Sequence, residues 1–148
     1  MAETVALSKI LNVREREKHD AQKDYHQSME YFEGVATRLY TLLKKKENAE
    51  EVQEAYLETT ISIDKIREQI TYIENLNKQI VQLQRDVRTA RTEMEAKQVK
   101  LTDAHVEVKK FEKIITYRKK EQQERIQKQE KIFMDELSVQ QYLNQKNR

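Results

Sequence analysis

The 148-residue sequence has no cysteine, no proline and no tryptophan, and it contains a single glycine, Gly34. Without cysteine the chain forms no disulfide and carries no thiol chemistry, which fits a reducing compartment. Sheets, barrels and other turn-rich folds need more glycine and proline than this, whereas long helices need almost none. These absences favour an all-α protein built from a few long helices.

Long apolar runs are missing as well. No stretch of the sequence approaches the ~20 consecutive apolar residues that a membrane-spanning helix requires. Residues 1–6 lack the basic start and apolar core that are typical of a signal peptide. We therefore expect a soluble, cytoplasmic protein.

Charged residues make up 36% of the chain and hydrophobic residues 37%, which suits a narrow helical seam better than a broad globular core. Disorder is the competing interpretation, and the regular spacing of Ile, Val and Leu argues against it for all but the ends. The net charge is only +2, but the charges are unevenly placed. Residues 47–58 carry five Glu and no basic residue, whereas residues 109–131 carry nine Lys or Arg against four Glu.

An apolar residue recurs at every seventh position in residues 66–115. A second, weaker row follows three residues after each member of the first and is interrupted by Gln69 and Lys97. Two such rows are typical of a coiled-coil seam, which has to pack against another helix. The first row contains Ile66, Ile73, Ile80, Val87, Met94, Leu101, Val108 and Ile115, and the second contains Leu76, Leu83, Ala90, Ala104 and Phe111.

The first third of the chain carries a less regular pair of rows. Arg14, Lys18 and Ser28 fall on these rows, and the long stems of Arg and Lys can lie along apolar surface with the charge outside. The apolar members are Leu7, Ala21, Val35 and Leu42 in one row and Leu11, Tyr25, Phe32 and Leu39 in the other.

The two pairs of rows are out of phase, which favours two helices joined by a turn over one unbroken helix. Four β-branched residues lie close together in residues 57–64 and weaken a helix there, and Ser62 is a suitable N-cap for the next helix. A turn near Thr60 pairs residue i with roughly residue 120 − i in an antiparallel hairpin. In this pairing the N-terminal start of the first helix lies opposite the end of the second helix's apolar row, at about Ile115.

The predicted fold class is therefore all-α, a long two-helix antiparallel coiled-coil hairpin whose second helix is longer than the first. We expect helix 1 at about residues 4–57, a turn at about 58–62 and helix 2 at about 63–140, with fraying at 144–148, in one elongated domain spanning residues 1–148. The competing assembly is a parallel dimer formed through residues 66–115.

No residue pattern indicates catalysis, a cofactor or a metal. The chain has no glycine-rich phosphate loop, and its three histidines are spread out. His19 and His26 can share a helical face with Asp20 and Asp24 nearby, but solvated surface histidines are the favoured interpretation. We predict a protein that is not an enzyme, with no catalytic residues, no cofactor and no metal site.

The basic residues 109–131 have two interpretations. They bind phosphates of nucleic acid or lipid, or they form a helix that docks on a protein. Four interleaved glutamates, Glu112, Glu121, Glu124 and Glu130, favour docking on a protein over binding to phosphates.

An apolar group lies at the C-terminal end of this basic stretch and beyond it. We favour its interpretation as an exposed anchor for another protein over that of a seam within the chain. It comprises Ile126, Ile132, Phe133, Met134, Leu137, Val139, Tyr142 and Leu143.

Four segments carry a resemblance to a known family. They are residues 7–18 (LSKILNVREREK), 31–40 (YFEGVATRLY), 107–113 (EVKKFEK) and 134–143 (MDELSVQQYL). Together they resemble the FliJ family of soluble components of the bacterial flagellar export apparatus. The resemblance covers nearly the whole length and is closest to the Gram-positive members.

This resemblance implies an antiparallel two-helix coiled coil, similar in shape to the central stalk of rotary ATPases and without activity of its own. It implies binding to the hexameric export ATPase FliI, to the export gate protein FlhA and to export chaperones, with no nucleic acid as a partner. It also implies a place in the cytoplasm at the flagellar base, in contact with the membrane only peripherally through the export gate.

The resemblance further implies which residues meet the export gate. The matching positions that keep apolar or aromatic character are Leu42, Tyr72 and Leu76, toward the hairpin end. Lys45 and Ala49 stand where some relatives carry bulkier aromatic residues.

At the opposite end, the resemblance implies that Leu7, Leu11, Phe133 and Leu137 contact the ATPase. Two alternatives remain open at this point. One is a structural coiled-coil protein that forms a parallel dimer and has no export role, and the other is a basic-helix protein that binds nucleic acid.

Overall fold

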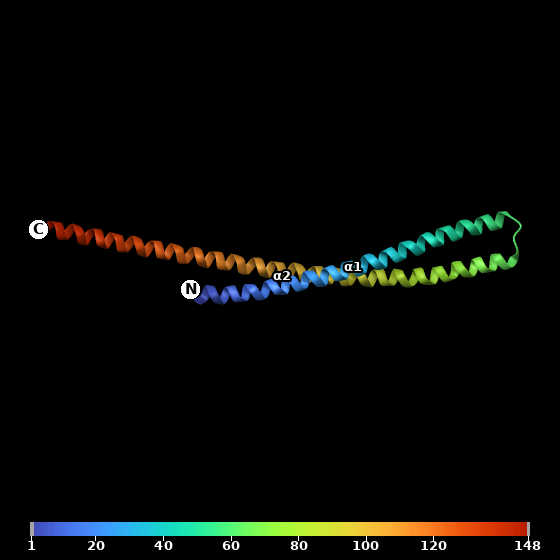
Figure 1. Cartoon of the computed structure of the whole chain (residues 1–148), viewed down its shortest axis with the longest axis horizontal. Helices are drawn as coiled ribbons and strands as arrows, with labels where there is room; N and C mark the ends of the chain where they lie inside the picture. The colour runs from blue at the N-terminus through green and yellow to red at the C-terminus, as the bar shows by residue number, and fades with distance from the viewer. Residues whose placement is uncertain (1, 148) are drawn as a thin grey trace. The chain divides into compact units, whose positions relative to one another are not determined.

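In a computed structural model that describes residues 2–147, nearly all of the chain is helical. Helix α1 spans Ala2–Glu58 and helix α2 spans Ile63–Lys146, with 57 and 84 residues respectively. Residues 59–62 form the loop between them, and no strand occurs among the described residues (Figure 1). The predicted fold class, an all-α hairpin with the longer helix second, is confirmed.

Both helices extend beyond the ends expected from the sequence. α1 begins at Ala2 rather than near residue 4, and α2 continues to Lys146 rather than ending near residue 140. The expected fraying is wrong for residues 144–146, because the last turn keeps its backbone hydrogen bonds. The Asn147 amide still donates to the Leu143 carbonyl at 3.1 Å. Arg148 lies outside the described residues.

The loop reverses the chain without glycine or proline. Thr59 Oγ1 donates to the carbonyl oxygen of Ala55 at 3.1 Å and so satisfies one of the last carbonyls of α1. Ser62 directly precedes α2, and its carbonyl accepts the amide of Ile66 at 3.3 Å. Asp64 places a negative charge in the first turn of α2, where it suits the helix dipole. Short polar and β-branched residues are thus sufficient to end one helix and start the next.

The chain divides into two compact units. One unit, here called the hairpin unit, is His19–Thr102, and the other, the terminal unit, combines Met1–Lys18 with Asp103–Arg148. Within each unit a part of α1 packs antiparallel on a part of α2. The expectation of one elongated domain remains a prediction.

In the hairpin unit, the positions on all four predicted rows are buried or half-buried. The tightest packing is at Val35 and Ala90, which are 2% and 1% exposed. Near these two residues the helices are also joined by a cation–π contact: the Arg91 guanidinium lies 5.7 Å from the centre of the Phe32 ring. The seam is therefore continuous in this unit, as the heptad rows predict.

Gln69 stands on a seam row without being apolar. Its Nε2 donates across the seam to the carbonyl oxygen of Ala49 at 2.9 Å. This carbonyl belongs to the backbone of α1, so the side chain of one helix is attached to the main chain of the other. Because a polar group in a seam is best satisfied in one alignment only, Gln69 helps to set the register of the two helices.

The terminal unit has a shorter seam of the same kind. Val108 and Ile115 are buried, and Leu7 and Leu11 are half-buried. Arg14 lies on the seam row, with its guanidinium 5.8 Å from the centre of the Phe111 ring and its Nη1 3.0 Å from Glu17 Oε2. The stem of Arg14 therefore fills a seam position while its charge reaches the edge, as expected.

Exchange of Ala90 for leucine tests how tightly the seam is packed. Ala90→Leu adds three carbon atoms where only 1% of the residue is exposed, so we expect a loss of about 1–3 kcal/mol in the free energy of unfolding. Chemical denaturation, monitored by circular dichroism, measures this free energy. The matched control is Ala96→Leu, an exposed site on the same helix, with an expected change within about 0.5 kcal/mol. Equal effects at both sites would show that Ala90 is not at a tight seam position.

Candidate partner-binding surfaces

The three residues predicted to meet an export gate lie in different environments. Tyr72 is 46% exposed, whereas Leu76 is only 4% exposed and belongs to the seam of the hairpin unit. Leu42 is half-buried on the opposing row of α1. Of the three side chains, that of Tyr72 presents the most surface to a partner, and Leu76 mainly holds α1 and α2 together.

Leu42 lies in a groove between α1 and α2 in the hairpin unit. The apolar part of its lining comes from Leu42 and Leu83, and Arg38 and Lys45 place two positive charges along the α1 side. The complete lining is Arg38, Thr41, Leu42 and Lys45 from α1 with Gln79, Gln82 and Leu83 from α2. Such a groove suits an apolar side chain flanked by an acidic group.

Tyr72 extends the surface that surrounds this groove. Gln79 lies seven residues after Tyr72, two turns along α2, so the two residues share one face of the helix. The sequence argument singled out Leu42 and Tyr72 but missed Arg38, Gln79 and Gln82. Each of the three directly precedes a seam residue in the sequence (Leu39, Ile80 and Leu83), and such neighbours of seam positions are the residues to examine for contacts at the edge of the seam.

Further exposed apolar side chains lie in the hairpin unit. Val52, Ile70 and Val81 are each about half exposed and were assigned no contact from the sequence. Each of them is the immediate neighbour of a seam position, on the side of the helix that the seam does not cover. The Nζ atom of Lys44 lies 5.7 Å from the ring of the exposed Tyr40, which adds a cation beside an aromatic contact residue.

The four residues predicted to meet an ATPase fall into two groups within the terminal unit. Leu7 and Leu11 are half-buried in the seam. Phe133 and Leu137, by contrast, are 63% and 38% exposed on α2. The first pair therefore supports the helix packing, and the second pair is open to a partner.

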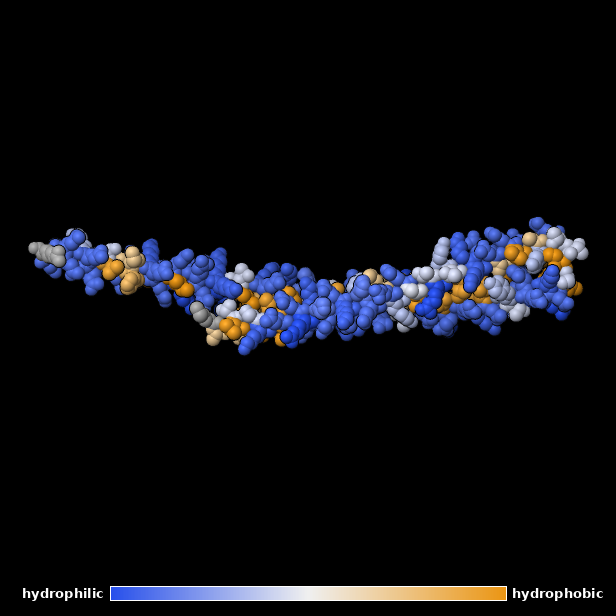
Figure 2. Space-filling view, in the orientation of Figure 1, coloured by the Kyte–Doolittle hydropathy of each residue, from blue (hydrophilic) through white to orange (hydrophobic). Residues whose placement is uncertain are grey.

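Residues 123–146 form a part of α2 without a helix to pack against, here called the free helix. Every residue in it is exposed, including all eight members of the predicted apolar anchor. Small hydrophobic areas interrupt its hydrophilic surface in the space-filling view (Figure 2). The α1 end nearest to it is tied to α2 by Glu3, whose Oε1 lies 3.4 Å from Arg118 Nε. Arg118 also contacts Glu121 at 3.6 Å.

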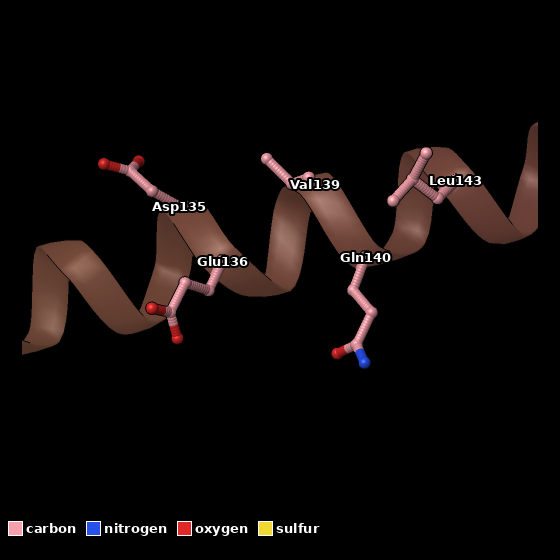
Figure 3. A pocket seen from close by; sticks show the side chains of 5 residues that line it. All are labelled: Asp135, Glu136, Val139, Gln140 and Leu143. Atoms are coloured by element: carbon pink, nitrogen blue, oxygen red, sulfur yellow. The ribbon is translucent and has the colours of Figure 1, made fainter.

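A shallow groove runs along the free helix itself. Asp135, Val139 and Leu143 line one side of it, and Glu136 and Gln140 the other (Figure 3). All five side chains come from a single helix, so the groove is open along its length. It has the form of a docking face for another helix and not of an enclosed cavity for a small molecule.

Metal-ligating side chains do not gather anywhere in the described range of residues 2–147, where no group of three or more was found. The Nε2 atom of His26 instead lies 3.2 Å from Glu30 Oε1 on the same face of α1. Asp24 lines a separate polar groove that also includes Ser28, Glu93 and Lys97. In the same described range, neither helix contains a segment long and apolar enough to cross a bilayer.

Comparison with known proteins assigns the chain to a family. The family described as the flagellar FliJ protein matches residues 3–147. The chain belongs to the FliJ family. The flagellar FliJ protein of Bacillus subtilis (strain 168) is 34% identical over 156 aligned positions, which cover 98% of this chain and 99% of that relative. No solved structure matches the chain. The resemblance found in the sequence is confirmed, and membership of the FliJ family makes this a flagellar, export-associated protein.

Two substitutions separate seam residues from surface residues near the hairpin end. Leu76→Ala removes a side chain that is 4% exposed, and we expect it to lower the free energy of unfolding by about 2–5 kcal/mol. Tyr72→Ala, four residues away on the same helix, is expected to change it by no more than about 0.5 kcal/mol. Thermal and chemical denaturation of both variants measures the difference. A stable Leu76→Ala variant would contradict the assignment of Leu76 to the seam.

Proposed function

We propose that this FliJ-family protein is a non-enzymatic stalk and adaptor of the bacterial flagellar type III export apparatus. In this proposal it binds the hexameric export ATPase FliI and the export gate protein FlhA, and it assists the delivery of substrates by export chaperones. The protein would act in the cytoplasm, at the inner face of the membrane, which it meets peripherally through the gate. The observation that carries the proposal is the match to the FliJ family along nearly the whole chain.

The ATPase contact is proposed for the terminal unit. Phe133 and Leu137 expose apolar side chains on a helix without an internal partner, and truncation of such anchors often removes most of the binding energy of an interface. Leu7 and Leu11 support this end from the seam, because they hold the start of α1 against α2. A helix that touches the subunits of a ring unequally changes the ring's activity only if it binds some subunit conformations better than others.

The gate contact is proposed for the hairpin unit, at Tyr72 and the groove that contains Leu42. The groove combines an apolar lining with the positive charges of Arg38 and Lys45. We expect it to accept an apolar side chain next to a carboxylate of the gate protein. Leu76 supports the same surface from beneath, because its burial fixes α1 and α2 in the arrangement that forms the groove.

A non-enzymatic function is supported by the residue types that the chain offers. Cysteine is absent and the single glycine cannot form a phosphate-binding loop. The polar side chains on the helix surfaces pair mainly within one helix, as Lys109 does with Glu112 at 3.3 Å. Pairs of this kind belong to the solvated faces of helices and are typical of structural rods.

The ATPase contact is tested by the double substitution Phe133→Ala with Leu137→Ala. We expect the affinity for purified FliI hexamer to fall at least about tenfold, because each truncation of a central apolar contact commonly costs about 1 kcal/mol or more. Surface plasmon resonance measures the affinity, and the ATP hydrolysis rate of FliI reports whether the bound protein still affects the ATPase. The control is Val99→Ala, which is exposed on α2 in the hairpin unit. Unchanged binding by the double variant would argue against this contact.

The gate contact is tested by Tyr72→Ala. Because Tyr72 is exposed and belongs to the hairpin unit, whereas the free helix belongs to the terminal unit, we expect weaker binding to the cytoplasmic part of FlhA and normal binding to FliI. Isothermal titration calorimetry with each partner provides both affinities. Tyr31→Ala removes another exposed tyrosine of the hairpin unit, 54% exposed, and should leave both affinities unchanged. If Tyr31→Ala and Tyr72→Ala behave alike, Tyr72 is not a gate residue.

A further inference from the structure

The seam of the hairpin unit has two sides. The groove at Leu42 and the predicted gate residue Tyr72 lie on one side, next to the rows that contain Leu42 and Leu76. The contact between the Phe32 ring and the Arg91 guanidinium lies on the other side, here called the far side of the seam. Residues of α2 that precede Arg91 by multiples of seven share this side, as do residues of α1 four positions after the row of Phe32.

Three exposed apolar residues meet these conditions close to the loop. They are Leu57, Ile63 and Ile70, which are 70%, 68% and 41% exposed. Because Ala49 accepts the hydrogen bond of Gln69, residues of α1 nearer the loop lie beside the start of α2. Leu57 is therefore close to Ile63, and Ile70 follows two turns further along α2. The space-filling view also shows hydrophobic areas close to the loop (Figure 2). The three residues form an apolar surface, here called the tip patch.

Acidic residues border the tip patch on both helices. Glu50 and Glu54 lie beside it on α1 and Glu74 lies beside it on α2, and all three are exposed. Glu50 has a long ion pair with Lys46, at 3.9 Å. Arg67 is the basic residue of α2 on this side. The borders of the tip patch are thus mainly negative.

The two sides of the seam therefore differ in charge. The groove on the side of Leu42 is flanked by Arg38 and Lys45. The hairpin end, by contrast, carries eight Asp or Glu against two Lys or Arg in residues 47–74. A basic partner is attracted to the tip patch and is repelled at the groove, so the two surfaces select different partners.

We propose that the tip patch binds an amphipathic helix of a partner protein, with Lys or Arg on both flanks of its apolar face. Such a helix covers Leu57, Ile63 and Ile70 with apolar side chains and places its basic side chains against Glu54 and Glu74. A helix is the fitting shape because it presents side chains at the same two-turn spacing, about 10 Å, that separates Ile63 from Ile70. Since the borders are exposed to solvent, added salt weakens the binding.

The tip patch is separate from the proposed gate contact. Ile70 and Tyr72 are two residues apart on α2, so their side chains leave the helix in directions about 200° apart. A partner on one side leaves the other side free. The inference does not depend on the proposed export function, because it concerns only the chemistry of this surface.

Two synthetic peptides test the tip patch in the full-length protein. Each is an amphipathic helix of about 18 residues with a leucine face, and its flanking positions are Lys in one peptide and Glu in the other. Fluorescence anisotropy in low salt is expected to give a dissociation constant of about 10–100 µM for the Lys peptide. Ile70→Ser should raise this constant at least about fivefold. The matched control is Val52→Ser, because Val52 is 40% exposed at the same end but lies one heptad after Lys45, on the groove side. It should leave the constant unchanged.

Charge reversal tests the borders of the patch. The double variant Glu54→Lys with Glu74→Lys should weaken the Lys peptide about tenfold. Circular dichroism confirms that each variant remains helical. Binding weaker than about 500 µM, equal losses with Ile70→Ser and Val52→Ser, or no effect of the charge reversal would each overturn the proposal.

Methyl NMR of the wild-type protein locates the bound peptide. The Lys peptide should shift the resonances of Ile63 and Ile70 and leave that of Val52 in place, and the Glu peptide should shift none of the three. Equal shifts with both peptides would overturn the charge preference. The affinity of Ile70→Ser for FlhA separates this inference from the proposed function and should be normal. If Ile70→Ser loses FlhA and keeps the Lys peptide, the tip patch is not the peptide site, and the export function stands.

Discussion

Packing along a narrow seam is the constraint on which the rest of this protein depends. The two helices have no sheet, disulfide or third helix to support them in the described residues, so a few side chains per turn hold them together. Val35, Ala90 and Val108 are nearly inaccessible, while the residues around them are half-buried or exposed. A residue on a seam row is thus committed to the fold, and a residue that binds a partner has to lie beside the seam or beyond its end.

Polar residues on the seam rows meet their hydrogen-bonding needs in different ways. Ser28, one of these residues, is 9% exposed and donates its hydroxyl to the Tyr25 carbonyl at 2.7 Å, so it is satisfied within its own helix. Arg14 is satisfied only in part: its stem lies in the seam and its Nη1 pairs with Glu17 at the edge, but its Nε is buried without a hydrogen-bond partner. The Ser28 hydrogen bond and the Arg14 ion pair both stay within α1, so neither sets the register of the two helices, unlike the hydrogen bond from Gln69 to the Ala49 carbonyl.

The seam and the hairpin could be predicted from the sequence because a seven-residue period is visible along a single helix. The helix ends were harder, since residues 141–146 carry no glycine or proline to mark a stop. The exposure of individual residues could also be predicted only in part from the sequence. Tyr72 and Leu76 are only one turn apart, yet one is 46% and the other 4% exposed. The groove around Leu42 depends on side chains from both helices, so no pattern within one helix describes it.

The hydrogen bond between Gln69 and the Ala49 carbonyl has a consequence for how this sequence can vary. Ala49 is 5% exposed and contributes only its backbone oxygen, so position 49 requires small size while position 69 requires an amide donor. A bulky side chain at 49 would push the amide of the half-buried Gln69 out of reach of the carbonyl and leave it without this partner. We therefore expect the two positions to vary together among members of the family, with an aromatic residue at 49 accompanied by a residue other than glutamine at 69.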